Sequence, residues 1–249
     1  MGMKLYKYRS LDTWYDEKAK VVTSGIDYCV DIINNNRLYF PKREQLNDPY
    51  EGSAIPINLG VCGNSIFSAM GCLHPIVEEE MNRYRILSFS DTCKSMPMWA
   101  HYAGNYNGVC FEFDIDRSFG NVHEVEYIDT PFEEISEQDV SDYRKVVKKN
   151  FFYKSKNWYY EKEYRIVNKS SNEFWEFESK YLTGIIVGFK ALERDVVKER
   201  IVDLARKKGI PLYKVFLTPR RYELSVIPID KEIDWGLDVI ENVAKDDMF

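Results

Sequence analysis

Two glutamates, Glu161 and Glu163, stand two residues apart in the stretch WYYEKEYRIV, residues 158–167. Its alternation predicts a strand, which would place both carboxylates on one face about 7 Å apart. One carboxylate so placed can stabilise a developing positive charge, and the other can orient or deprotonate an acceptor. The simpler interpretation is a solvent-exposed strand face on which Arg165 pairs loosely with a glutamate. The glutamate pair is the first candidate for catalysis.

Two other predicted strands end in polar side chains. Residues 4–9 alternate as a short strand that places Arg9 at its end, and a guanidinium there is a forked donor that keeps its charge. Residues 86–90 also alternate, so Ser88 and Ser90 share one face. We expect that face to look at something polar.

A stretch of about eighteen residues between two predicted strands is rich in aromatic side chains, and a loop of that length in a compact domain is often functional. Trp99 and Tyr102 could stack on a flat ligand. His101 could serve as a polar contact or a proton carrier. A structural histidine with satisfied hydrogen bonds is the competing interpretation for His101.

Composition limits the classes of function. The chain has 249 residues, a net charge of −6 and a pI near 5.3, which weighs against a surface that grips nucleic acid as a whole. Its five cysteines show no CxxC pair, so we expect reduced thiols, no metal site and a cytoplasmic protein. No signal segment or membrane-length apolar run occurs in the sequence.

The periodicities predict the fold class. We expect one α+β domain over residues 1–230 with a mostly antiparallel split sheet, followed by an acidic tail over 231–249. Helices are predicted over 26–33, 75–83, 141–156 and 193–208, and further strands over 38–40, 109–113, 124–127, 182–189, 212–217 and 224–228. The helix predicted over 141–156 carries a lysine cluster that includes Lys154 and Lys156, either a solvated face or an entrance for an anionic ligand.

Four sequence blocks resemble the domain of unknown function 2971 family of bacteria and phages. The blocks span most of residues 4–190, but the family name supplies no activity. They are Leu5-Tyr6-Lys7-Tyr8-Arg9-Ser10; Leu38-Tyr39-Phe40 with Leu46-Asn47-Asp48-Pro49-Tyr50-Glu51; Met98-Trp99-Ala100-His101-Tyr102-Ala103 with Gly108-Val109-Cys110; and Lys156, Trp158, Tyr160-Glu161 with Glu163-Tyr164-Arg165.

A more distant resemblance is to ADP-ribosyltransferases of the arginine-serine-glutamate class. There a first-strand arginine, a Ser-x-Ser strand and a Glu-x-Glu strand follow one another along the chain, and Arg9, Ser88-Phe89-Ser90 and Glu161-Lys162-Glu163 come in the same order. Each piece alone is common by chance, and the class does not require His101-Tyr102. The order is the main support.

This second resemblance implies an ADP-ribosyltransferase-like fold and NAD as substrate. Glu163 would stabilise the cationic ribose, and Glu161 and His101 would act beside it. The remaining candidates, Arg9, Ser88, Ser90, Trp99 and Tyr102, would hold the diphosphate, ribose and nicotinamide. The expected partners are a nucleotide and an unknown protein or nucleic-acid acceptor, with no membrane, and the expected role is that of a toxin or phage-defence effector.

Two other classes of function stay open. A metal-dependent nuclease or phosphodiester hydrolase would use Asp48, Glu51 and the two glutamates for a divalent ion, with Lys154 or Lys156 on the phosphate. A non-enzymatic module would bind a nucleotide or a protein through the aromatic loop. Nicotinamide release, metal-dependent strand cleavage, and ligand stabilisation without turnover distinguish the three.

Overall fold

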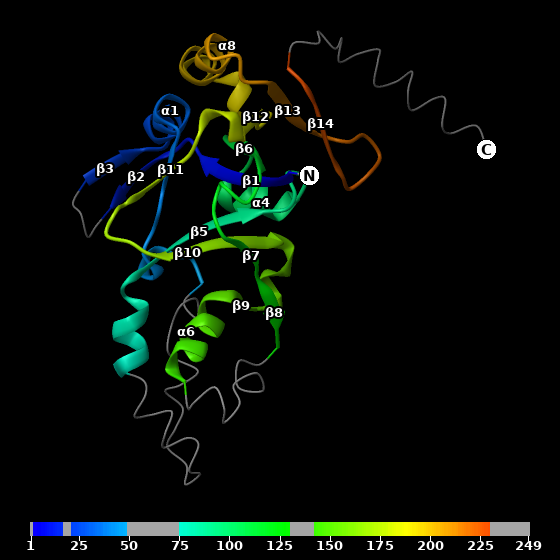
Figure 1. Ribbon diagram of the computed structural model, residues 1–249. Coiled ribbons are helices and arrows are strands. Elements are labelled where there is room, and N and C mark those ends of the chain that lie inside the picture. The colour runs from blue at the N-terminus through cyan, green and yellow to red at the C-terminus, as the bar shows by residue number, and fades with distance from the viewer. Residues whose placement is uncertain (1, 17–20, 49–74, 130–141, 230–249) are drawn as a thin grey trace. The chain divides into compact units, whose positions relative to one another are not determined.

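The computed structural model describes residues 2–16, 21–48, 75–129 and 142–229 (Figure 1). The chain forms two compact units, each assembled from segments that are distant in the sequence. Unit 1 contains the N-terminal residues through Lys7 and the segments Asn34–Thr92 and Asp114–Tyr181. Unit 2 contains Tyr8–Ile33, Cys93–Phe113 and the chain from Leu182 onward. The tail predicted over 231–249 lies outside the described residues, and the single domain over 1–230 stays a prediction.

The sheet of unit 1 is antiparallel, with the strand order β7-β10-β5-β1. Ser90 lies opposite Tyr6 on one neighbouring strand and opposite Glu163 on the other. β5 is therefore the strand between the other two. The bounds are β1 (Met3–Ser10), β5 (Tyr84–Ser90), β7 (Val122–Glu124) and β10 (Glu163–Lys169).

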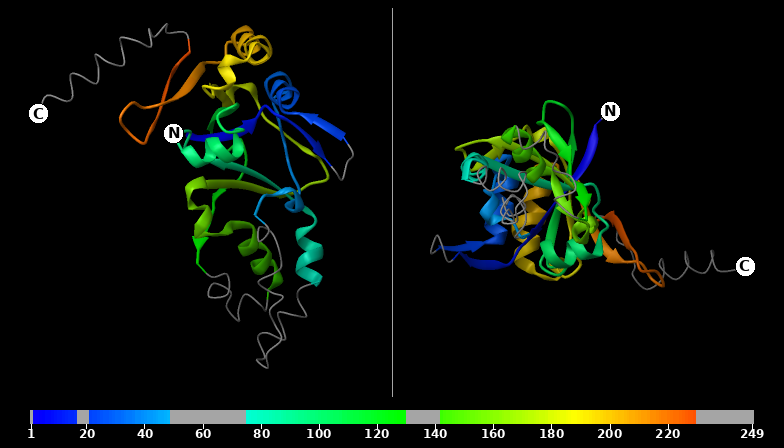
Figure 2. Two further views of the ribbon diagram at one scale, coloured as in Figure 1. Left: turned by 180° about the vertical axis from the view of Figure 1, so that it is seen from behind. Right: turned by 90° about the horizontal axis from the view of Figure 1, so that it is seen from below.

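Two helices pack against this sheet. A helix over residues 75–81 and α6 (Tyr143–Phe152) extend from the same side of the β5–β10 pair (Figures 1 and 2). The N-terminus of α6 is capped by the Asp142 side chain, which accepts from the Arg144 amide at 3.1 Å. Their apolar faces meet β5 in one cluster of Val77, Met81, Ile86, Val146, Val147 and Phe151.

Short elements complete unit 1. β4 (Arg37–Tyr39) pairs antiparallel with β11 (Phe174–Glu176), and β8 (Glu126–Ile128) pairs parallel with β9 (Tyr153–Ser155). Three 3-10 segments lie between the strands: η1 (Arg43–Gln45), η2 (Lys156–Glu161) and η3 (Ser179–Tyr181).

Unit 2 has the strand order β6-β12-β13-β14, in which only the β12–β13 pair is parallel. A separate hairpin joins β2 to β3. The strands are β2 (Thr13–Asp16), β3 (Val21–Ser24), β6 (Gly108–Ile115), β12 (Leu182–Val187), β13 (Leu212–Leu217) and β14 (Leu224–Pro228). The helical elements are α1 (Gly25–Asn35), α4 (Met96–Tyr102), η4 (Ala191–Glu193), α7 (Asp195–Val197), the π-helical η5 (Lys198–Val202) and α8 (Asp203–Lys207).

Helix α4 and its C-terminal turn replace most of the irregular loop predicted before residue 109. Ser95 caps α4, since its hydroxyl accepts from the Met98 amide at 3.4 Å. The turn then passes through three residues with positive φ, namely Gly104, Asn105 and Tyr106. Their conformation lets the Asn105 and Tyr106 amides bond back to helix carbonyls, as at many helix C-termini. The prediction of a continuous irregular loop was wrong, because local capping makes a short helix.

The α+β class and the mostly antiparallel pairing are confirmed. Strands over 212–217 and 224–228 have their predicted bounds. The helix predicted over 193–208 forms with a π-helical segment in its middle.

Phe151 is the largest side chain of the unit 1 cluster and is 1% exposed. We expect Phe151→Ala to lower the free energy of unfolding by about 3 to 5 kcal/mol, because it leaves a cavity that the neighbours fill only partly. Urea unfolding followed by circular dichroism measures the change. The matched control is Tyr222→Ala, since that tyrosine is 97% exposed and its loss should cost under about 0.5 kcal/mol. Equal losses in both variants would contradict this core assignment.

Candidate functional site

The candidate site is a buried charge cluster in unit 1, which we define as Lys154, Glu161, Glu163 and Arg165. β9 supplies Lys154, η2 ends at Glu161, and β10 supplies Glu163 and Arg165. All four are at most 6% exposed. The cluster therefore lies inside the protein and not on a solvated strand face.

Glu161 and Glu163 do not belong to one strand. The single strand predicted over 158–167 was wrong, because η2 occupies the first part and β10 begins at Glu163. Lys162 between them has a left-handed backbone, with φ of 44°. This conformation ends η2 and turns the chain into β10. The two glutamates approach each other across a turn and not along a pleat.

Glu163 is held by a bidentate ion pair. The Arg165 Nε donates to Glu163 Oε1 and the Arg165 Nη2 donates to Glu163 Oε2, both at 2.7 Å. The third guanidinium nitrogen, Nη1, donates to the Phe151 carbonyl at 2.6 Å. Arg165 is completely buried, so its fork fixes the Glu163 carboxylate relative to the end of α6.

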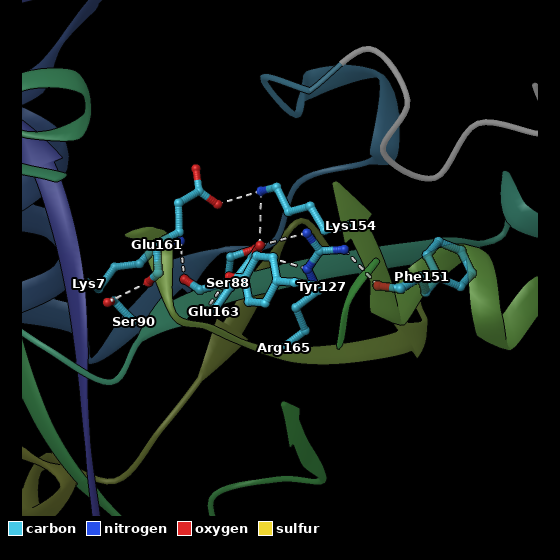
Figure 3. Close-up of polar contacts among 9 residues, drawn as sticks. All are labelled: Lys7, Ser88, Ser90, Tyr127, Phe151, Lys154, Glu161, Glu163 and Arg165. Atoms are coloured by element: carbon cyan, nitrogen blue, oxygen red, sulfur yellow. Dashed lines mark hydrogen bonds and ion pairs between the residues drawn. The ribbon is translucent and has the colours of Figure 1, made fainter. Parts of the chain in front are cut away.

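Lys154 bridges the two carboxylates. Its ammonium donates to Glu163 Oε2 at 3.0 Å and also to Glu161 Oε2 (Figure 3). The indole of Trp158 lies against the same ammonium, 5.1 Å from nitrogen to ring centroid. The sequence places Lys154 in a basic cluster on a helix, but the structure buries it on β9. That expectation of a solvated or entrance-lining lysine was wrong for Lys154.

Side chains from neighbouring strands hold the cluster in place. The Ser88 hydroxyl hydrogen-bonds the Glu163 carboxylate, and the Ser90 hydroxyl donates to the Glu161 carbonyl at 2.6 Å. The Glu163 amide donates to the Tyr127 hydroxyl at 2.9 Å (Figure 3). The polar face predicted for the two serines is therefore the face that contacts the glutamate segment.

Burial and charge act in opposite directions here. Burial raises the pKa of Glu163 above its ordinary value; Lys154 opposes this shift, and the charge of Glu161 adds to it. Burial alone would lower the pKa of Lys154, but the two glutamates outweigh it and raise that pKa above its ordinary value. Lys154 is thus a firmly charged ammonium.

Asp48 adds a third carboxylate to the surroundings of the cluster and is 5% exposed. Burial lowers the pKa of the Arg165 guanidinium to about 9, and the negative charge of Asp48 opposes that shift. Arg165 is therefore still charged at neutral pH. Among the described residues, three carboxylates are set against two cations.

The other predicted site residues belong to unit 2. The Arg9 guanidinium lies over the Tyr28 ring at 4.8 Å, and its Nη2 donates to the Tyr28 hydroxyl at 3.4 Å. Trp99 is completely buried, donates from Nε1 to the Cys93 carbonyl at 2.8 Å and stacks on Tyr106. These contacts give Trp99 a packing role.

His101 is exposed on α4, and Tyr102 beside it is half-buried. Their roles toward a ligand stay predictions, as do those of Arg9 and Trp99. The structure brings together the four predicted residues Ser88, Ser90, Glu161 and Glu163 within unit 1.

The sequence did not predict that Lys154 and Arg165 are buried with the glutamate pair. It offered Lys154 only as a phosphate-binding candidate of the hydrolase alternative, and Arg165 only as a loose surface partner of a glutamate. Arg165 carried a signal, because it stands two residues after Glu163 on the same strand and an alternating strand puts both on one face. Lys154 carried none, since it follows a lysine-rich helix and looks like one more exposed cation. Only the pairing of β9 with β8 turns it inward.

A family model described as "Protein of unknown function (DUF2971)" matches residues 98–166. The resemblance to that family is therefore confirmed over this stretch, which contains most of α4 and the whole charge cluster. No curated protein and no solved structure matches the chain.

Among the described residues, no group of three or more His, Cys, Asp or Glu side chains is placed to hold a metal ion. Within the same part of the chain, no helix is long and apolar enough to cross a membrane.

We expect Arg165→Met to lower the free energy of unfolding by about 3 to 5 kcal/mol, because it removes the bidentate partner of a buried carboxylate. Urea denaturation at neutral pH measures the loss. The control is Arg83→Met, whose arginine pairs with Glu79 and Glu80 at the surface and should matter by less than about 1 kcal/mol. A loss at Arg165 no larger than that at Arg83 would show that the buried pair is not needed for stability.

Proposed function

We propose that this chain is an ADP-ribosyltransferase-like enzyme that cleaves the nicotinamide–ribose bond of NAD and transfers ADP-ribose to an acceptor. The observation that carries the proposal is the adjacency of the motif strands. β10, which begins at the second glutamate, pairs with the Ser-x-Ser strand β5, and β5 pairs with β1. The Ser88 hydroxyl contacts the Glu163 carboxylate directly. Order along the chain alone would not require that contact.

The proposed reaction gives each glutamate a distinct task. The bond between the ribose C1′ and the nicotinamide nitrogen breaks, its electron pair leaves with neutral nicotinamide, and positive charge develops on the ribose. The Glu163 carboxylate stabilises that charge. The acceptor then bonds to C1′ and gives up a proton, for which Glu161 is the nearby base.

The hydrogen bonds of Glu163 restrict how a substrate can use it. Both of its oxygens already accept from Arg165, and Oε2 also accepts from Lys154. Arg165 is bound at both ends, by Glu163 and by the Phe151 carbonyl, so it stays in place. A ribose hydroxyl that reaches Glu163 would therefore share or displace the Lys154 contact.

The remaining parts of the proposal stay predictions. Arg9 would bind the diphosphate or ribose, Tyr102 would contact nicotinamide, and His101 would assist with a proton. A toxin or phage-defence role in the cytoplasm, with a protein or nucleic-acid acceptor, remains an expectation from the resemblance.

A binding module without turnover is the second candidate. It is favoured by the low exposure of Glu161 and Glu163, 3% and 4%, and by the ion pairs that already hold them. In that case the cluster would stabilise the fold and a nucleotide would bind elsewhere on the chain. The metal-dependent hydrolase gains no support from the described residues, and Glu51, one of its predicted ligands, lies outside them.

Glu163→Gln is expected to lower the rate of nicotinamide release from NAD by a factor of about 100 to 1,000, because the amide cannot stabilise a cationic transition state. The assay compares purified wild type and variant at one NAD concentration. Since the variant also loses a buried charge, only protein with a native circular dichroism spectrum enters the comparison, at a temperature below its unfolding transition.

The matched control is Glu124→Gln, which neutralises an exposed glutamate on the neighbouring strand β7. It should release nicotinamide at the wild-type rate. Thermal unfolding with and without millimolar NAD accompanies the assay, because a ligand that binds only the folded protein raises its melting temperature. NAD stabilisation without nicotinamide release would favour the binding module. If NAD neither raises the melting temperature nor releases nicotinamide, NAD is excluded as the substrate.

A further inference from the structure

Lys154 has a place in unit 1 that its sequence neighbourhood does not explain. Lys145, Lys148 and Lys156 of the same lysine-rich stretch are exposed, whereas Lys154 is 6% exposed. Its ammonium donates to both glutamates and lies against the Trp158 ring. A lysine is seldom buried without carboxylate partners, because burial removes the hydration of its ammonium and so raises the free energy of the charged form.

The two glutamates are paired with cations in different ways. Glu163 already has the bidentate partner Arg165, whose third nitrogen donates to the Phe151 carbonyl. Glu161 forms an ion pair with Lys154. Two buried carboxylates near each other repel, and without a shared cation one of them tends to take a proton.

We propose that Lys154 is a positioning residue that keeps Glu161 and Glu163 ionised together and fixes their separation, so that it sets the lower pH limit of the reaction. This inference rests on the proposed function for its catalytic part. Lys154 touches the two glutamates and not the reacting atoms. Its ammonium supplies the positive charge that a second ionised carboxylate requires in this buried place.

The groups that face Lys154 come from several elements packed around it. Arg165 on β10 donates to the same Glu163 oxygen as Lys154, and the negative charge of Asp48 acts on Arg165. Tyr127 on β8 and Tyr160 on η2 interact electrostatically with Lys154, and burial raises the pKa of both phenols. Both phenols therefore stay neutral near pH 7, and the carboxylates are the groups that respond to the loss of Lys154.

The first arm of the test measures stability against pH and needs no activity. Lys154→Met removes the shared cation, so the pKa of Glu163, already raised by burial, should rise further. A carboxyl whose folded-state pKa is raised favours folding at low pH, and that contribution is lost as pH rises through the raised value. The difference in melting temperature between wild type and Lys154→Met should therefore widen as pH rises above about 5. A difference independent of pH would overturn the proposal.

The second arm measures the pH profile of nicotinamide release. In Lys154→Met the acid limb of the profile should move upward by about 1 to 3 pH units, whereas Lys154→Arg should keep the wild-type limb because the charge is restored. The double variant Lys154→Met with Glu161→Gln removes the repelling neighbour as well. Its rate falls, but its acid limb should return toward the wild-type position.

A purely structural lysine predicts a different pattern. In that case Lys154→Met would contain less folded protein, but its rate of nicotinamide release per folded molecule would keep the acid limb of the wild-type pH profile. That result would overturn the positioning role. If wild type releases no nicotinamide, the proposed function fails while the stability arm still decides the charge role of Lys154. If wild type is active and Lys154→Met keeps the wild-type limb, the proposed function stands and this inference fails.

Discussion

The bidentate pair between Glu163 and Arg165 is the interaction on which unit 1 depends. A guanidinium with no solvent exposure must have its hydrogen bonds satisfied, and here the carboxylate and the Phe151 carbonyl satisfy them. This requirement joins β10 to the end of α6. The same carboxylate accepts from Lys154, which ties in β9, and from Ser88, which ties in β5. One buried carboxylate therefore fixes the relative position of four elements.

The same ion pairs would also serve a catalytic site at this position. Two carboxylates that must both be charged at neutral pH lie away from water, and two cations offset the cost of burying them. The apolar cluster around Phe151 excludes water on the α6 side. Interactions between charges are stronger in such surroundings than in water, which would suit the stabilisation of a cationic transition state. The binding module would use the same cluster for stability alone.

Period-2 patterns predicted β1 and β5 to within two residues at each end, whereas the strand predicted over 158–167 begins only at Glu163. The serine face of β5 was predicted to meet something polar, and Ser88 meets Glu163. The strand start at Glu163 was not predictable, because it depends on the left-handed backbone of Lys162, and a lysine gives no local signal for that conformation.

The position of Lys154 was also beyond the sequence. Lys154 lies on β9, which pairs in parallel with β8. Each of these strands has only three residues, and the two are distant along the chain, so no local pattern predicts their pairing. The helix α4 was missed for a local reason. Its N-terminal cap Ser95 and a Pro near its start are visible in the sequence, but its seven residues are too few to show a clear helical period.

We propose that Glu161 and Glu163 carry their negative charges together at neutral pH and that NAD acts at this pair. Carbon-13 NMR of protein labelled at the glutamate carboxyl carbons tests it most directly, with the two signals assigned through the single Gln variants. The account predicts both signals at ionised positions at pH 7 and a change in the Glu163 signal as NAD is added. A protonated signal for either residue, or a Glu163 signal unmoved by saturating NAD, would contradict it.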